Sequence, residues 1–456
     1  MAATARRRSA EDPGEDLGIL SGEGGIEATT RLYALLIVAF SLISAGSFTL
    51  DTTLIAVGAL LVAFAAFMRG YTALAFVVAS RAKVIVDPEV VAPEGERVTI
   101  RYTIKNGSWI PVHFLEMLFR LPQRLGYTPP TASTTLTLPP KSVSVVSVTV
   151  EARIGRHVVS PPLATVRDPL GLFRSPFFRI GQQVEVRGIP RLEQATLRMP
   201  LSAAISYGAV RSRSPGSGTE FLSTRPYRPG DELRRIVWKS IAAGKPLSVK
   251  EFEAQPGAEV IFIVALTEEA LEGPKLATPY EHAARLVASA ARYLARRGYQ
   301  LGLIVLGRRV TMSRGMLRGV KGYMEVLRVF SEAELEPMSG GTLRVLLEPK
   351  EIHSIVSSLS PKSTTLYFFL TYSESLPLEE LTKTLASLQL KHNVRVFVPM
   401  PPLPGGYVDE AEVVYLAKLR AVLEASRKMV ERLKRQGVRA EIVLPKRFPT
   451  LLLEVL

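Results

Sequence analysis

The residues best suited to chemistry in this chain are carboxylates set among many cations in the stretch 216–252. Glu220 and Asp231 could act as a general acid and base, which is the chemistry of a hydrolase. The same residues are explained without catalysis if Asp231 caps a helix and Glu220 pairs with an arginine. Because no nucleophile and base can be assembled from the sequence, we expect no catalytic residue and no enzyme, with a hydrolase as an alternative.

A short helix must position these groups. The turn Pro229-Gly230 precedes Asp231, which predicts a helix starting near Glu232 and ending at Gly244. The residues at helical spacing on its apolar side are Leu233, Ile236, Val237 and Ile241, and those on its basic side are Arg234, Arg235 and Lys239. The basic side could dock an acidic protein, lie on anionic lipid or bind nucleic acid; no nucleic-acid module accompanies it, so nucleic acid is the least favoured.

Composition indicates the number of folded units and the charge of a partner, and it excludes cysteine-based sites. The chain has 456 residues, a net charge of +15 and no cysteine. Its length predicts two or three folded units, and its charge favours an anionic partner. Without cysteine, thiolate zinc sites and disulfides cannot form, and the five histidines are widely spaced. We therefore expect no cofactor and no metal.

The N-terminal region predicts a membrane anchor. Leu32 to Leu50 carries no charge and reaches across most of a bilayer core, and a second apolar run, Thr52 to Met68, resumes after Arg69 as far as Ser80. Residues 31–80 are therefore expected to form a transmembrane hairpin, after a disordered cytoplasmic tail at 1–30. Arginine and lysine flank the hairpin and are missing from its loop, so both ends should be cytoplasmic. The predicted location is the cell membrane, with two spans and the bulk of the chain in the cytoplasm; two buried helices of a soluble core are the alternative.

Residues 83–190 change to short alternating runs such as Val98–Ile104 and Val143–Val150, which predict an all-β, immunoglobulin-like sandwich. Asn106-Gly107-Ser108 fits a glycosylation sequon but, in the cytoplasm, reads as a turn. Turn-forming and apolar residues near the end of this region predict a domain hinge whose apolar side chains can plug an adjoining surface. These residues are Asp168, Pro169, Leu170, Gly171, Leu172 and Phe173.

Residues 257–456 read as α/β, because apolar strands alternate with helices. The expected strands are Val260–Leu266, Leu301–Leu306, Thr365–Leu370, Val394–Pro399 and Ala440–Leu444. The expected helices are Pro279–Arg297, Val320–Glu334, Leu378–Leu388 and Ala411–Lys434.

Taken together, the hairpin, the sandwich, the Asp168–Phe173 segment and a signature segment at 191–256 resemble the domain-of-unknown-function-58 family. The signature residues are Gly216, Gly218, Glu220, Phe221, Arg225, Tyr227, Pro229, Gly230, Asp231, Arg234, Ile236 and Trp238. The resemblance implies a von Willebrand factor A-like, Rossmann-type domain at 257–456 and association with MoxR-type AAA+ ATPases. It brings no settled enzyme activity.

The chain departs from this pattern at two places. Related A-type domains bind a divalent cation through Asp-x-Ser-x-Ser after the first strand, where this chain has Ala265, Thr267 and Glu269. Losing the first carboxylate removes the main anionic ligand for a hard cation. In the central helix, Val237 and Ala243 stand where relatives commonly carry an acid and a base, which suggests that apolar packing replaces an ion pair.

These inferences favour a membrane-anchored scaffold or adaptor that docks protein partners, with an AAA+ ATPase as the expected partner. Its expected interaction residues are the signature residues together with Arg235 and Lys239. Contact with anionic lipid is a further possibility. A cation-dependent, ligand-binding A-type domain is an alternative of a different class, which the loss of the aspartate at Ala265 disfavours.

Overall fold

The computed structural model describes residues 25–122, 125, 131–192, 215–226, 248–253, 259–273, 276–401 and 410–444. The chain divides into two compact units. The first contains the residues up to Val90 with Arg97–Glu151 and His157–Val186. The second contains Val91–Glu96, Ala152–Arg156 and the chain from Arg187 onward. Two short segments therefore belong to the second unit although their sequence neighbours belong to the first.

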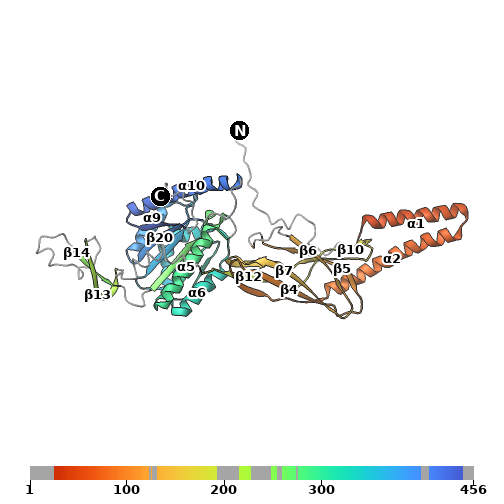
Figure 1. Ribbon diagram of the computed structural model, residues 1–456, viewed down its shortest axis with the longest axis horizontal. Coiled ribbons are helices and arrows are strands. Elements are labelled where there is room, and N and C mark those ends of the chain that lie inside the picture. The colour runs from red at the N-terminus through yellow and green to blue at the C-terminus, as the bar shows by residue number, and fades with distance from the viewer. Residues whose placement is uncertain are drawn as a thin grey trace, which may run out of the picture. The chain divides into compact units, whose positions relative to one another are not determined.

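Two long apolar helices form a hairpin in the first unit, α1 (Thr30–Thr49) and α2 (Thr52–Ser80) (Figure 1). The Asp51 carboxylate accepts the Thr53 N–H at 2.8 Å and so begins α2. The helices approach closely at Gly58, where a Cβ would lie 2.6 Å from the Ala39 carbonyl oxygen. Both are long and apolar enough to cross a membrane by length and composition. Although Arg69-Gly70 interrupts the apolar run, α2 continues through it without a break.

The rest of the first unit is β-rich, because its strands alternate buried and exposed residues. One sheet has the order β1-β10-β9-β5-β6, with β11 also on β9, and another has the order β2-β4-β7. The strands of the first sheet are β1 (Glu27–Ala28), β5 (Val112–Arg120), β6 (Thr131–Leu138), β9 (Leu163–Arg167), β10 (Phe173–Arg174) and β11 (Phe178–Arg179). Those of the second are β2 (Lys83–Ile85), β4 (Arg97–Lys105) and β7 (Val143–Glu151). The rings of Tyr102 on β4 and Phe119 on β5 lie 5.3 Å apart, so the inner faces of the two sheets share a core.

Two further sheets are small. β3 (Glu89–Pro93), β12 (Val184–Ile189) and β8 (Gly155–Val159) pair in the order β3-β12-β8. β13 (Pro215–Pro226) and β14 (Ser248–Glu253) form an antiparallel pair with register shifts between Gly216 and Phe221 and between Phe221 and Ser223.

A seven-stranded sheet organises the second unit, in the order β17-β16-β15-β19-β20-β21 with β18 also on β16. Five strands are parallel: β15 (Glu259–Ala265), β16 (Gln300–Leu306), β19 (Thr365–Leu370), β20 (Asn393–Pro399) and β21 (Arg439–Val443). The short strands β17 (Val310–Met312) and β18 (Leu317–Arg318) are antiparallel to β16. Counting β17 as the third strand, the order is 3-2-1-4-5-6, that of a doubly wound fold.

Helices cover both faces of this sheet, as continuous apolar strands require. One face packs against α5 (Pro279–Arg296) and α6 (Gly319–Glu332). The other packs against α7 (Gly340–Leu347), α8 (Pro349–Leu359), α9 (Leu378–Gln389) and α10 (Glu410–Arg435). A 3-10 turn, Glu269–Leu271, follows β15. Figure 1 shows α5 and α6 on one side of the sheet and α9 and α10 on the other.

The five parallel strands and four of the helices lie where the sequence predicts them, within about two residues, as is usual for element ends. The short strands β17 and β18 were not predicted. The α7 and α8 pair was not expected. Glu348 ends α7 and also stands before α8, with Pro349 at the first turn of α8, so the two helices join without the Gly or polar loop that marks a helix boundary.

Candidate functional site

One candidate site lies at the carboxyl edge of the parallel strands, between β15 and β19, where doubly wound folds bind ligands. Ala265 ends β15, and Thr267 and Glu269 follow it. Thr371 and Ser373 follow β19. The fold therefore does bring together the degenerate positions predicted from the sequence and the loop after the strand that ends at Leu370.

The polar groups at this edge largely satisfy one another. Thr267 Oγ1 accepts the Ala270 N–H at 3.2 Å, and the hydroxyls of Ser373 and Ser375 lie 2.8 Å apart. Glu269 Oε1 accepts the Glu374 N–H at 3.4 Å, and its Oε2 is buried without a hydrogen-bond partner. Among the described residues, no three His, Cys, Asp or Glu side chains are grouped so that they could hold a metal ion. The edge thus offers one buried carboxylate oxygen and hydroxyls that are already in use.

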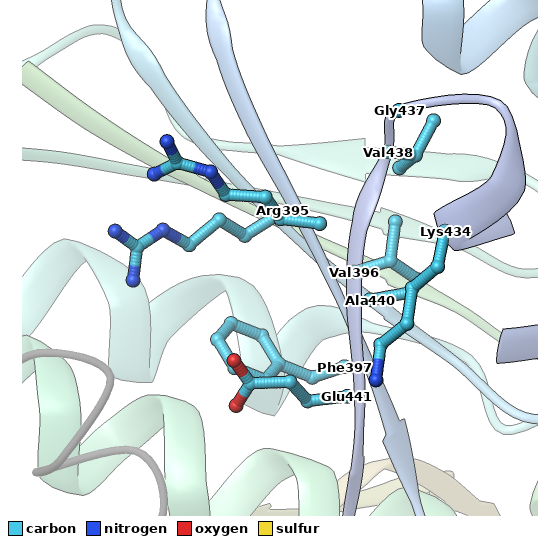
Figure 2. A pocket seen from close by; sticks show the side chains of 9 residues that line it. Arg395, Val396, Phe397, Lys434, Gly437, Val438, Ala440 and Glu441 are labelled. Atoms are coloured by element: carbon cyan, nitrogen blue, oxygen red, sulfur yellow. The ribbon is translucent and has the colours of Figure 1, made fainter. Parts of the chain in front are cut away.

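A second feature is a pocket of about 480 Å³ at the end of the sheet, along β20 and β21 (Figure 2). It is lined by Arg395, Val396, Phe397, Lys434, Gly437, Val438, Arg439, Ala440 and Glu441. The parallel register sets Arg395 beside Arg439 and Phe397 beside Glu441. Because side chains alternate along a strand, these four share one face, while Val396 and Ala440 point into the core beneath α10.

The pocket is predominantly cationic. Arg439 and Lys434 are exposed and Arg395 is half-buried, against the single carboxylate of Glu441. Figure 2 shows the Glu441 carboxylate beside the Phe397 ring and the Arg395 side chain extending along the same face. Arg395 is also the register partner of Tyr367 on β19; burial raises the pKa of the Tyr367 hydroxyl, and the Arg395 charge opposes that rise. The Phe397 ring is buried in the core of the sheet, so the cations are the groups that can receive a carboxylate or phosphate.

Sequence reasoning missed this pocket, although a signal was present. Each of the two strands places an arginine early in an otherwise largely apolar run, in Val394-Arg395-Val396 and in Val438-Arg439-Ala440. A charged residue near the start of each of two neighbouring parallel strands is unusual, since such strands are commonly apolar throughout. The two arginines meet because β20 and β21 are parallel neighbours.

A contrasting charged cluster anchors α5 in the second unit. Arg285 pairs with Glu94, with 2.9 Å between Nε and Oε2, and Arg153 pairs with Glu281, with 2.8 Å between Nε and Oε1. Glu281 also accepts from Thr278 in the capping box that begins α5. The Glu94 and Glu281 side chains are 2% and 0% exposed. Burial raises the pKa of Glu94, and its bonds to Arg285 oppose that rise.

The segment Asp168–Phe173 lies within the first unit, at the base of the helical hairpin. Leu172 and Phe173 pack into a cluster with Leu32 of α1 and Ala65 of α2. The Asp168 carboxylate accepts the N–H groups of Leu170 at 2.9 Å and Phe173 at 2.5 Å, which fixes the turn.

Direct bonds tie the same segment to the start of α1. Thr29 Oγ1 donates to the carbonyl of Gly171 at 2.6 Å, and Arg31 Nη1 donates to the carbonyl of Leu170 at 3.2 Å. These contacts hold the segment against the hairpin. Its predicted role as a hinge concerns motion and stays a prediction.

The signature residues lie mostly outside the described residues. The signature residues outside are Tyr227, Pro229, Gly230, Asp231, Arg234, Ile236 and Trp238. The predicted interaction residues Arg235 and Lys239, the predicted helix at Glu232 and the substituted positions Val237 and Ala243 also lie outside. The backbone of Gly216, Gly218, Glu220, Phe221 and Arg225 forms part of β13.

Comparison with solved structures gives weak similarity. The alkylpurine DNA glycosylase of Pseudomonas fluorescens bound to DNA containing an abasic site analog aligns with a TM-score of 0.15 at 18% identity, over 35% of this chain and 49% of that one. The GH20 exo β-N-acetylglucosaminidase of Vibrio harveyi in complex with N-acetylglucosamine aligns with a TM-score of 0.26 at 9% identity, over 80% and 76%. The chain thus spans about half of the glycosylase. At these scores neither similarity carries an argument about fold or function.

Sequence comparison is more informative. No curated protein matches the chain. Residues 223–356 match the model of the family described as "Protein of unknown function DUF58". This match spans the later signature residues and the first half of the α/β unit. This part of the chain is therefore similar to the DUF58 family, in agreement with the resemblance found in the sequence.

Proposed function

We propose that the protein is a membrane-anchored adaptor whose α/β unit docks an acidic segment of a partner protein. The observation that carries the proposal is the exposure of large apolar side chains along the α1–α2 hairpin. They include Tyr33, Ile37, Phe40, Phe48, Leu60 and Phe67. Exposing such a surface to water is unfavourable by about 25 cal/mol for each Å², whereas a bilayer would cover it.

The charges beside the hairpin favour one orientation. Arg31 lies in the first turn of α1, and Arg81 and Lys83 follow α2, while the connecting Leu50-Asp51 turn has no lysine or arginine. By the positive-inside rule, both ends of the hairpin then lie in the cytoplasm. The β-rich region and the α/β unit would work there, as an immunoglobulin-like sandwich and a von Willebrand factor A-like head; the 3-2-1-4-5-6 strand order of the second unit supports a Rossmann-type head.

The docking site that the geometry supports best is the pocket on β20 and β21. Its three cationic side chains favour an acidic partner segment, and its 480 Å³ hollow gives that segment a place to lie. The β21 edge pairs with no described strand beyond β20. The charges along it also protect the edge from pairing with other sheets, which is how natural sheets avoid aggregation. The resemblance of the chain to its family makes a MoxR-type AAA+ ATPase the partner to test.

The test uses the full chain in lipid nanodiscs and a purified MoxR-type ATPase from the same genome, in the presence and absence of ATP. We expect binding that falls steeply with ionic strength and is lost in Lys434→Glu/Arg439→Glu. Arg420→Glu is the matched control, because Arg420 is an exposed cation on α10 about 20 Å along the helix from Lys434. Equal binding by both variants would exclude the pocket, and failure of the wild-type chain to bind would exclude this partner.

A further inference from the structure

The turn that joins β4 to β5 in the first unit displays an exposed tryptophan. Trp109 is 80% exposed, although tryptophan is among the residues that proteins most consistently cover. The chain contains only two tryptophans. Tryptophan also has a characteristic place at membrane interfaces, where its apolar ring meets lipid and its N–H meets water.

The turn is built to hold its shape independently of Trp109. Asn106 is fully buried, and its Nδ2 donates to the carbonyls of Ile110 at 3.0 Å, Leu138 at 3.2 Å and Pro139 at 3.0 Å. Its Oδ1 accepts the N–H and the hydroxyl of Ser108, both at 2.9 Å. Because both the amide nitrogen and the amide oxygen of one buried side chain hold the turn, it presents its exposed tryptophan in a defined position.

The turn also contacts α2 just after Arg69, which interrupts the apolar run. The Tyr71 hydroxyl donates to the Pro111 carbonyl at 2.8 Å, and the Tyr71 ring lies 5.9 Å from the His113 ring. Tyr71 stands two residues after Arg69. From the start of α2 to Arg69 the helix rises about 25 Å, which is close to the roughly 30 Å of a hydrocarbon core.

The apolar part of α1 begins at the same height at which that of α2 ends. Leu32, which follows Arg31, packs with Ala65 and Met68 of α2, so the first charged residue of α1 lies level with the last apolar turn of α2. A membrane that covers the hairpin would therefore have its headgroup layer beside Tyr71 and the turn.

A cation accompanies the tryptophan. Lys141 Nζ lies 5.3 Å from the centroid of the Trp109 ring and donates to the Gly107 carbonyl. An ammonium group at this depth attracts anionic headgroups, while the ring occupies the boundary between headgroups and acyl chains. We propose that Trp109 and Lys141 form a second membrane contact, which inserts into the anionic headgroup layer and fixes the β-rich region against the bilayer. This inference rests on the proposed membrane anchoring.

The experiment places the full chain in vesicles of phosphatidylcholine and phosphatidylglycerol whose acyl chains carry bromine, a tryptophan quencher, at either shallow or deep positions. In Trp238→Phe, Trp109 is the remaining tryptophan. We expect its fluorescence to shift to the blue and to be quenched more by shallow than by deep bromine. Trp109→Phe/Trp238→Phe/Phe40→Trp reports on the hairpin, and deep bromine should quench it more strongly because Phe40 is an exposed residue in the middle of α1.

The outcomes separate the two proposals. Quenching of the Phe40→Trp reporter without quenching of Trp109 would overturn the second contact and leave the anchor in place, as expected if Trp109 instead meets a protein. Quenching of neither reporter would overturn both. Lys141→Gln should reduce the quenching of Trp109 in the mixed vesicles, and quenching that is independent of phosphatidylglycerol would overturn the role of anionic headgroups.

Discussion

Two charged clusters in the α/β unit differ in burial and in the balance of positive and negative side chains. Around α5, Glu94 and Glu281 are buried and each is bound by an arginine. On β20 and β21, Arg439 and Lys434 are exposed, and cations outnumber the single carboxylate of Glu441. Charge alone therefore does not mark a functional surface. A buried, matched pair holds the fold together, whereas an exposed excess of one sign in a hollow can recognise a partner.

The largest effect on stability is expected at Arg285. Arg285→Ala would leave the Glu94 carboxylate buried without its counter-ion, which should lower the free energy of unfolding of the second unit by about 3–5 kcal/mol. Glu94→Gln should cost less, because it keeps an acceptor and removes a charge that burial disfavours. Chemical denaturation followed by circular dichroism measures both. In Arg420→Ala, which removes an exposed pair with Glu424, the expected loss is at most about 0.5 kcal/mol.

His392 is a second buried group for which an uncompensated charge should destabilise the fold, here on acidification. Burial, with smaller contributions from Lys391 and His353, lowers the pKa of His392 to about 4. Its Nδ1 lies 3.3 Å from the backbone nitrogen of Thr364, which donates to it. The unfolded chain therefore binds a proton near pH 6.5 and the folded chain only near pH 4, so this stabilisation is present above pH 6.5 and is lost as the pH falls toward 4.

The loss should be on the order of 1–2 kcal/mol, measured as the change in unfolding free energy between pH 7 and pH 4.5. His392→Asn keeps an acceptor without a titrating ring and should flatten this part of the profile. His353→Asn should leave most of the slope, because desolvation is the main cause of the shift. An unchanged slope in His392→Asn would show that another group is responsible.

The pocket cations should matter little for stability. Lys434→Glu/Arg439→Glu should change the free energy of unfolding by no more than about 0.5 kcal/mol, because both residues are exposed. The same denaturation experiment tests it. A loss of several kcal/mol would mean that these cations are structural, like those at α5, and would remove the distinction between the two clusters.

The smallest effect is expected at the carboxyl edge of the sheet. Glu269 supplies the buried carboxylate oxygen there, and Mg²⁺ prefers several oxygen ligands in near-octahedral geometry. Addition of Mg²⁺ after treatment with a chelator should leave the thermal unfolding midpoint unchanged in the wild-type chain and in Glu269→Gln. Stabilisation by Mg²⁺ that disappears in Glu269→Gln would restore the cation-dependent alternative.

Much of the fold followed from local signals. The apolar runs of β15, β16, β19 and β20 and the helical spacing of α5 are local patterns, so the sequence predicted these elements nearly at their observed bounds. The helices α7 and α8 were missed because Glu348 and Pro349 join them without a loop.

The charged clusters depend on long-range pairing. Glu94 and Arg285 are 191 residues apart in the chain, and Arg395 and Arg439 meet only through the parallel register of β20 and β21. The local sequence places an arginine in each of β20 and β21, but it does not show that the two strands are neighbours. The signature stretch has a strong local pattern, which predicts a turn and a helix. Most of its residues lie outside those that the structure describes, so this prediction stays untested.

The most direct measurement is a titration of the full chain in nanodiscs with a fluorescent polyglutamate peptide, at low and at physiological salt. We expect saturable binding at low salt that weakens as salt rises, is lost in Lys434→Glu/Arg439→Glu and persists in Arg420→Glu. Binding that is equally strong in both variants would show that the peptide reads the overall positive charge of the chain and not the pocket on β20 and β21, and would contradict the proposed docking site.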